Sequence, residues 1–188
     1  QKVLIQAGSG GVGTMAIQVA KYLGTTVATT TSAANFDLVK SLGADIVIDY
    51  KTQDFETVLE DFDLVLHSQD TKTLEKSLRI LKPGGKVISI SGPPDTAFTK
   101  GMGLSWWLKT AIFFMSSKVR KQARHLDVNY SFLLMKASGK QLSAVGKLIE
   151  AGVIHPVVDK IFPFEKMNEA MSYLERGSAK GKVVVKVK

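Results

Sequence analysis

The fold is decided near the beginning of the chain, by residues 2–13, which read KVLIQAGSGGVG. The short apolar run at 3–5 predicts a buried β-strand, and the apolar residues spaced through 15–23 predict a helix that ends at Gly24. Between the two lies the pattern G-x-G-x-x-G, formed by Gly8, Gly10 and Gly13. The flanking strand and helix are what make this pattern informative.

Each glycine of this loop has its own steric role. Gly8 lets the chain turn sharply out of the strand, Gly10 keeps a Cβ away from a pyrophosphate, and Gly13 lets the helix approach the sheet. Free N–H groups and the helix dipole attract the same anion. We therefore predict a dinucleotide-binding loop; the alternative is a glycine-rich turn without a ligand.

The rest of the chain alternates strand and helix patterns. Further strands are predicted at 26–30, 45–50, 63–66, 86–90 and 130–135, and helices at 36–42, 71–81 and 138–149. The strands lack polar alternation, as expected when both faces of a sheet are buried. Short strand–helix–strand connections imply right-handed parallel crossovers. We predict an α/β fold of the Rossmann type, a doubly wound parallel sheet of order 3-2-1-4-5-6 with helices on both faces. A strand at 157–162, a helix at 165–175 and a strand at 182–187 follow.

The end of the second strand indicates which dinucleotide binds. NAD sites place an Asp or Glu there to hold the ribose 2′-hydroxyl, whereas residues 29–32 read TTTS. Hydroxyl groups would bond a 2′-phosphate that a carboxylate would repel, so we predict NADP(H) in preference to NAD(H). Lys40 and Tyr50 are candidates for further contacts. The alternative is that these hydroxyls merely suit a strand end.

The composition excludes several other functions. The 188 residues include no Cys, which excludes disulfides and thiolate metal sites. The net charge of +8 arises from residues 109–188, which hold 15 basic and 6 acidic residues. These cations accompany no nucleic-acid-binding module, so we expect no nucleic-acid partner and interpret them as a solvated face or an attraction for an anionic cofactor.

Residues 93–127 form a segment too long for an ordinary loop. It holds an apolar block from Leu104 to Met115, followed by basic residues as far as Arg124. The block is too short to span a membrane. We prefer a helix packed on the sheet or on a dimer partner; a lid over the substrate cleft and a membrane-surface helix are the alternatives, and a membrane partner is not expected.

The spacing of the histidines does not predict a metal site. His67, His125 and His155 are far apart and lack H-x-x-x-H or H-E-x-x-H spacing, so we predict no zinc in this chain. The sequence identifies no general acid, and we assign no catalytic residue.

Several segments together resemble a known family. They are residues 2–24, 40–45 (KSLGAD), 48–50 (IDY), 81–86 (LKPGGK), 156–159 (PVVD), 162–164 (FPF) and 181–184 (GKVV). This set resembles the cofactor domain of the medium-chain dehydrogenases/reductases, in particular the quinone oxidoreductase (zeta-crystallin-like) branch, whose members are often labelled zinc-binding.

The resemblance implies which residues meet the cofactor. The pyrophosphate would lie on Gly8, Gly10, Gly11, Val12 and Gly13. The adenosine ribose and its 2′-phosphate would meet Thr31, Ser32 and Tyr50, and Asn35 stands where many relatives have a Lys that pairs with this phosphate. A ribose would be bordered by His67 and Ser68. The nicotinamide side would be formed by Ser91, Gly92, Phe132 and Leu133. Lys182 would reach back towards the cofactor.

The resemblance also implies a domain organisation. Members of the family carry a GroES-like domain before the cofactor domain, and it supplies substrate contacts and any zinc ligands. We expect residues 1–159 to form the NADP(H)-binding domain and residues 160–188 to return to a GroES-like domain. The chain begins at Gln1, without an initiator Met, so we expect a fragment. Because the GroES-like domain would supply most substrate contacts, we expect little or no turnover from this fragment alone.

For the complete protein, the resemblance implies an NADP(H)-dependent oxidoreductase that transfers a hydride to a small-molecule quinone, enone or carbonyl substrate. The alternatives are the cofactor domain of a zinc-dependent alcohol dehydrogenase and a non-catalytic, crystallin-like scaffold that binds NADPH. A methyltransferase is disfavoured, because Gln6–Ala7 and Thr30–Thr31 stand where its acidic residues would be. We expect a cytoplasmic location and a homodimer formed through the edge strand 130–135.

Overall fold

The computed structural model describes residues 1–98, 103, 105–177 and 179–187. Six strands of this part of the chain form one sheet of order β3-β2-β1-β4-β5-β6. They are β1 (Lys2–Ile5), β2 (Thr26–Thr31), β3 (Ile46–Asp49), β4 (Phe62–His67), β5 (Leu81–Ser89) and β6 (Asn129–Phe132). The pairs β1–β4, β2–β3, β4–β5 and β5–β6 are parallel. The α/β class, the Rossmann strand order and the edge position of β6 are therefore confirmed.

Two strand boundaries differ from the prediction by more than one residue. β5 begins at Leu81, which pairs with Phe62, and the register then shifts before Lys86 pairs with Leu64. β6 ends at Phe132 instead of continuing to residue 135, because its neighbour β5 ends at Ser89, the partner of Phe132. Leu133 N–H still donates to Ser89 O at 2.8 Å, and farther along the chain Met135 is 83% exposed.

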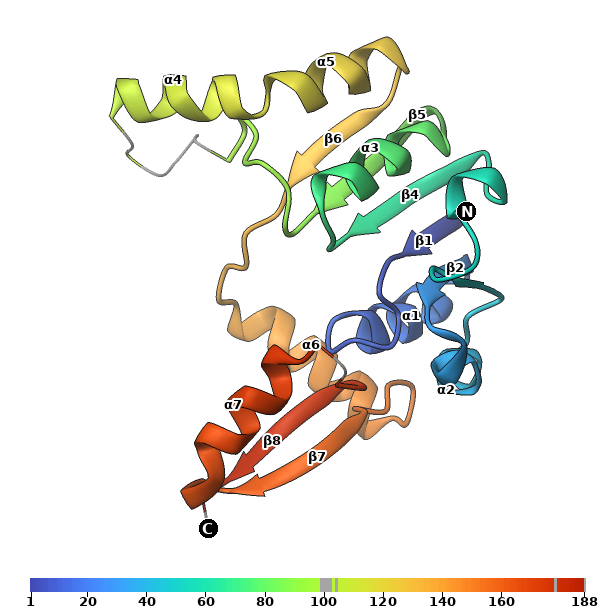
Figure 1. Cartoon of the computed structure of the whole chain (residues 1–188), viewed down its shortest axis with the longest axis vertical. Helices are drawn as coiled ribbons and strands as arrows, with labels where there is room; N and C mark the ends of the chain where they lie inside the picture. Colours follow the sequence, from blue (N-terminus) through green and yellow to red (C-terminus); the bar gives the residue numbers. More distant parts are fainter. Residues whose placement is uncertain (99–102, 104, 178, 188) are drawn as a thin grey trace. The chain divides into compact units, whose positions relative to one another are not determined.

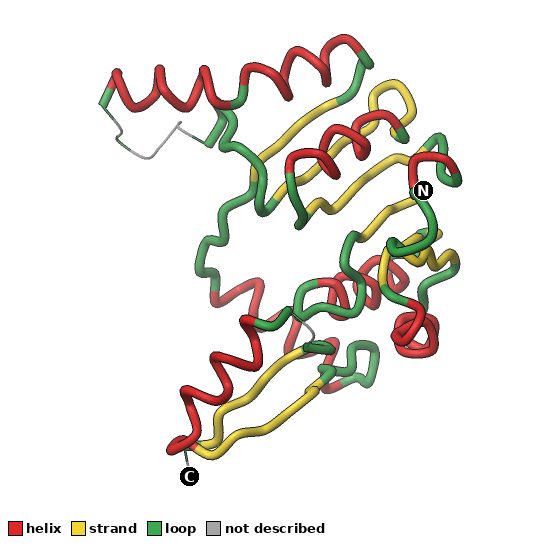
Figure 2. Tube along the Cα trace, viewed as in Figure 1, coloured by secondary structure: helices red, strands yellow, loops and turns green. Residues whose placement is uncertain are grey.

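The chain divides into two compact units. The first comprises residues 1–6 and 50–137. It contains β1, β4, β5, β6, the 3₁₀ turn η2 (Phe55–Thr57) and the helices α3 (Thr71–Arg79), α4 (Trp106–Met115) and α5 (Ser117–His125). Figures 1 and 2 show α3 lying along β4 and β5. The apolar side chains of this layer are buried, among them Val65, Leu74, Leu78 and Val87.

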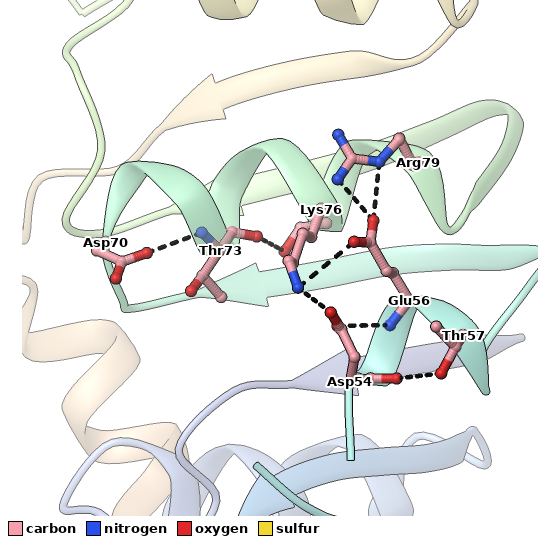
Figure 3. Close-up of polar contacts among 8 residues, drawn as sticks. Asp54, Glu56, Thr57, Asp70, Thr73, Lys76 and Arg79 are labelled. Atoms are coloured by element: carbon pink, nitrogen blue, oxygen red, sulfur yellow. Dashed lines mark hydrogen bonds and ion pairs between the residues drawn. The ribbon is translucent and has the colours of Figure 1, made fainter. Parts of the chain in front are cut away.

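A polar network joins η2 to α3 at the surface of the first unit (Figure 3). Lys76 pairs with both Asp54 and Glu56, and Arg79 lies 2.6 Å from the Glu56 carboxylate. The hydrogen bond from Lys76 lowers the pKa of the Asp54 carboxyl group. At the start of α3, the side chain of Asp70 accepts the N–H of Thr73 at 2.8 Å and caps the helix.

The apolar block of the 93–127 segment forms α4, although Leu104 lies outside the described residues. No residue of α4 is buried, and Trp106 is 79% exposed. A helix packed on the sheet would bury a face of apolar side chains, and no side chain of α4 is fully buried. Its roles as a dimer contact, a lid or a membrane-surface helix stay predictions. The basic residues that follow form α5, a helix we did not predict, which buries Val119 and Ala123 on one face. No helix in the described part of the chain is long and apolar enough to cross a membrane.

The second unit comprises residues 7–49 and 138–188. It contains β2, β3, α1 (Gly13–Tyr22), η1 (Ala33–Asn35), α2 (Phe36–Ser41), α6 (Gly139–Glu150), β7 (Val158–Pro163), η3 (Phe164–Lys166), α7 (Met167–Glu175) and β8 (Lys182–Lys186). β7 and β8 form a separate parallel sheet, with α7 beside it (Figure 1). Gln18 ties α1 to the segment before β7, because its side chain both donates to and accepts from the backbone of His155. The domain boundary after residue 159 stays a prediction.

Candidate functional site

The glycine loop is anchored to β2 within the second unit. Its first residue, Ala7, has a φ of +53°, and its N–H donates to Thr30 Oγ1 at 3.2 Å. Gly8 N–H donates to the Thr30 carbonyl at 3.0 Å, and Gly10 N–H donates to the Ala7 carbonyl at 2.9 Å. These bonds form a tight turn immediately before α1.

Steric crowding explains why glycine occupies two of the three motif positions. A Cβ on Gly8 would overlap Thr29 Oγ1, and a Cβ on Gly13 would overlap the Ala7 carbonyl oxygen and approach Gly8 Cα at 2.6 Å. A Cβ on Gly10 would meet only Ala7 O, at 3.3 Å. Gly10 is therefore the least crowded of the three motif positions within the protein, which fits the role of a position approached by a ligand.

The C-terminal part of the chain reaches this loop. Gly181 N–H donates to Ser9 O at 2.8 Å, and Gly10 and Gly181 form an isolated parallel bridge. Lys182 Nζ would lie 3.1 Å from a Cβ on Gly11. The structure thus brings together two residues that were predicted from distant motifs, and it adds a cation to the N–H groups of the loop.

A neutral polar cluster lies where β2 ends. Ser9 Oγ accepts hydrogen bonds from Thr31 Oγ1 at 2.9 Å and from Asn35 Nδ2 at 3.2 Å, and the same Asn35 amide reaches Ser32 Oγ at 3.2 Å. Asn35 Oδ1 is buried without a hydrogen-bond partner among the described residues. Sequence reasoning missed Ser9, which occupies a variable position of the motif. The cluster offers hydroxyl and amide donors and no carboxylate of its own.

The other predicted residues lie in the first unit. Tyr50 directly follows β3 in the sequence. The carboxyl ends of β4, β5 and β6 carry the rest, which are His67, Ser68, Ser91, Gly92, Phe132 and Leu133. Tyr50 is 62% exposed, and Ser91 and Leu133 are also exposed. Ser91 Oγ donates to the Gln69 carbonyl at 2.7 Å. Phe132 packs edge-on against Phe98, with ring centroids 5.2 Å apart.

His67 differs from its neighbours because it is fully buried. Its Nε2 lies 3.0 Å from the Asp70 carbonyl oxygen, which only accepts, so Nε2 carries the proton. Nδ1 then accepts from the Ser89 hydroxyl at 2.8 Å. Burial lowers the pKa of His67, which favours this neutral form. Both ring nitrogens are therefore bonded to the protein.

The described residues contain no group of three or more His, Cys, Asp or Glu side chains placed to bind a metal ion. His125 lies on α5 and His155 lies in the segment before β7. The donor set that zinc prefers in proteins is Cys, His and carboxylate in a four-ligand cluster. The described side chains do not fit such a site, and the absence of zinc from this chain stays a prediction.

Comparisons with known proteins agree with this architecture. The chain is 38% identical, over all its length and 49% of the relative, to a protein named NAD(P)H oxidoreductase RTN4IP1, mitochondrial, from Danio rerio. It is 32% identical, over 98% of its length and 40% of the relative, to 2-methylene-furan-3-one reductase from Solanum lycopersicum. A quinone oxidoreductase structure from Coxiella burnetii superposes with a TM-score of 0.82, at 30% identity, over the whole chain and 53% of that protein.

The chain thus spans about half the length of these curated relatives. The family described as zinc-binding dehydrogenase matches residues 42–185, which is most of the chain. With the strand order of the sheet and the relatives above, this match shows that the chain belongs to the zinc-binding dehydrogenase family of the medium-chain dehydrogenase/reductase superfamily.

Proposed function

We propose that the chain is the cofactor-binding part of an NADP(H)-dependent oxidoreductase that transfers a hydride to a quinone, enone or other carbonyl substrate. The observation that carries this proposal is the glycine loop, with Lys182 beside Gly11 and a cluster of hydroxyl and amide groups at Ser9. Relatives named for NAD(P)H, for a furanone reduction and for quinone support the reaction class.

In the second unit, the proposed ligand is the adenosine diphosphate half of the dinucleotide. The N–H groups that open α1 and the Lys182 ammonium would meet the pyrophosphate. The donors around Ser9, together with Thr31, Ser32 and Asn35, would meet the 2′-phosphate. Charge-assisted hydrogen bonds of this kind are stronger than neutral ones, so the 2′-phosphate adds affinity that NAD(H) lacks.

In the first unit, the proposed ligand is the nicotinamide half. Ser68, Ser91 and Gly92 follow the ends of β4 and β5. Phe132 ends β6, and Leu133 follows it. Polar backbone on one side and apolar side chains on the other would orient the ring and exclude water from one of its faces. The bound cofactor supplies the hydride, and the contribution of these residues is its position.

The activity belongs to the whole protein. Because the chain spans about half of its relatives, we expect little or no turnover from residues 1–188 alone. A homodimer through β6 is a further proposal, since an edge strand offers unpaired N–H and C=O groups. A cytoplasmic location stays a prediction; relatives carry the words mitochondrial and chloroplastic in their names.

Titration of the chain with NADPH, NADH and S-adenosylmethionine tests the proposal. We expect NADPH to bind, NADH to bind about tenfold more weakly, and S-adenosylmethionine not to bind. Equal affinities for NADPH and NADH would contradict the NADP preference. Failure of both dinucleotides to bind, measured by calorimetry on folded protein, would contradict the cofactor site itself.

A further inference from the structure

One buried hydroxyl group lies at the carboxyl end of β5, the strand between β4 and β6 in the first unit. Ser89, the last residue of β5, is fully buried and contacts His67 Nδ1 at 2.8 Å. Because that nitrogen accepts, the Ser89 proton points at His67 and its lone pairs are left for other donors. Gly92 N–H donates a hydrogen bond to Ser89 Oγ at 2.7 Å. Ser89 therefore links the end of β4 to the loop that follows β5.

A second hydroxyl holds the same loop from β6. Tyr130 OH donates to the Pro93 carbonyl at 2.6 Å. Burial raises the pKa of Tyr130 to about 12, so the phenol keeps the proton that it donates. A Cβ on Gly92 would come within 2.7 Å of both Ser89 Oγ and Tyr130 OH. Gly92 thus lies so close to Ser89 and Tyr130 that a side chain at this position would force the loop or one of the two hydroxyl groups to shift.

The network also joins this loop to the one after β4. Ser91 Oγ donates to the Gln69 carbonyl at 2.7 Å, and His67 Nε2 donates to the Asp70 carbonyl at 3.0 Å. Loops 68–70 and 91–93 are therefore held to each other and to the sheet by side-chain hydrogen bonds. Their exposed edge carries Ser91, whereas Ser89 and His67 beneath it are inaccessible.

We propose that Ser89 is a positioning residue for the nicotinamide half of the cofactor. Its hydroxyl touches no ligand; it fixes loop 91–93 directly, and loop 68–70 through His67, in the arrangement that receives the ring. Fixing a binding loop in advance spares the entropy cost of ordering it when the ligand binds. This inference rests on the proposed function, which assigns the nicotinamide half to these two loops.

The test compares two ligands that differ by the nicotinamide half: NADPH and 2′,5′-ADP. Ser89→Ala leaves the Gly92 N–H and His67 Nδ1 without their partner and loosens the loop, so NADPH should bind about tenfold more weakly. The affinity for 2′,5′-ADP, which lacks nicotinamide, should stay unchanged. Gly92→Ala keeps every hydroxyl but forces the loop away from Ser89 and Tyr130, and we expect the same selective loss.

Ser116→Ala is the matched control. Ser116 is also a fully buried serine, bonded to Ile112 O and Arg120 Nε at the junction of α4 and α5. It should change neither affinity. Circular dichroism shows whether each variant folds; if Ser89→Ala does not, Gly92→Ala decides the test.

The outcomes separate this inference from the function on which it rests. If wild-type protein binds neither ligand, the proposed function fails and this inference fails with it. If wild type binds both ligands but the folded variants lose neither, or lose both equally, the positioning role is wrong. Selective loss of NADPH in both variants, with Ser116→Ala unchanged, supports it.

Discussion

Lys182, close to the end of the chain, lies beside Gly11 in the glycine loop, where a Cβ on Gly11 would come within 3.1 Å of its Nζ. The two residues are held there by the backbone bond from Gly181 N–H to Ser9 O. A cation thus stands next to the N–H groups that open α1, and this arrangement attracts an anion from two directions.

Replacing that cation should weaken the binding of phosphate-containing ligands. Lys182 is exposed, so its charge is screened, and Lys182→Gln should lower the affinity for NADPH about two- to fivefold at low salt, with a smaller difference at high salt. The control is Lys186→Gln, which removes the same charge from the far end of β8. Calorimetry at two salt concentrations measures the effect, and equal losses in both variants would point to net charge alone.

Substitutions of two glycines in the loop should affect stability and NADPH binding to different extents. Gly10→Ala brings a Cβ within 3.3 Å of one backbone atom, Ala7 O, which is a milder contact than those at Gly13, so the melting temperature should fall less than in Gly13→Ala while NADPH affinity falls about tenfold or more. Gly13→Ala places a Cβ against Ala7 O and Gly8, and should lower the free energy of unfolding by about 1–3 kcal/mol. Thermal unfolding and ligand titration of both variants check this. If the Gly10→Ala protein binds NADPH with wild-type affinity, the pyrophosphate does not bind at this loop.

The sequence predicts the strand order because the pattern that encodes it is local. Apolar runs, glycine punctuation and short connections lie within a few residues of each other, and the parallel crossover rule then restricts the topology. The end of β6 depends on a distant residue, since it stops where Ser89 ends β5. No local property of Leu133 or Met135 indicates that limit.

The helix α5 and the buried network were missed for different reasons. Val119 and Ala123, four residues apart, lie on one face of α5. This helical spacing is present in the sequence, but basic residues surround it. Ser89 and Tyr130 look like ordinary members of apolar strands. Their role depends on burial and on a glycine from another segment, Gly92, and neither is readable from spacing.

Substitution of Asn35 should change the preference of the protein for NADPH over NADH. Its Nδ2 bonds Ser9 and Ser32, and its Oδ1 is buried without a partner in the described structure. Asn35→Lys would place a cation in this cluster of hydroxyl groups, and we expect NADPH affinity to rise about three- to tenfold with NADH affinity unchanged. Asn35→Leu is the control without charge or donors and should weaken NADPH only. An equal gain for both dinucleotides would show that the cluster does not meet the 2′-phosphate.

His67 should make the folded protein sensitive to mild acid. Burial holds the pKa of His67 below its ordinary value of 6.5, so the unfolded chain takes up a proton more readily than the folded protein does. The free energy of unfolding should therefore fall as the pH drops from 7 to 5. The hydrogen bond from Lys76 lowers the pKa of Asp54, whose stabilising contribution is lost only below its ordinary value of 3.8, outside this range.

In His67→Gln, an amide that does not titrate replaces the imidazole, and the slope of stability against pH between 7 and 5 should become shallower, whatever the stability at pH 7. His125→Gln, a change at an exposed position on α5, is the control for the general effect of removing a histidine. Urea unfolding at three pH values measures both slopes. If wild type and His67→Gln lose stability in parallel, the acid sensitivity arises elsewhere and the neutral His67–Ser89 pair is not its source.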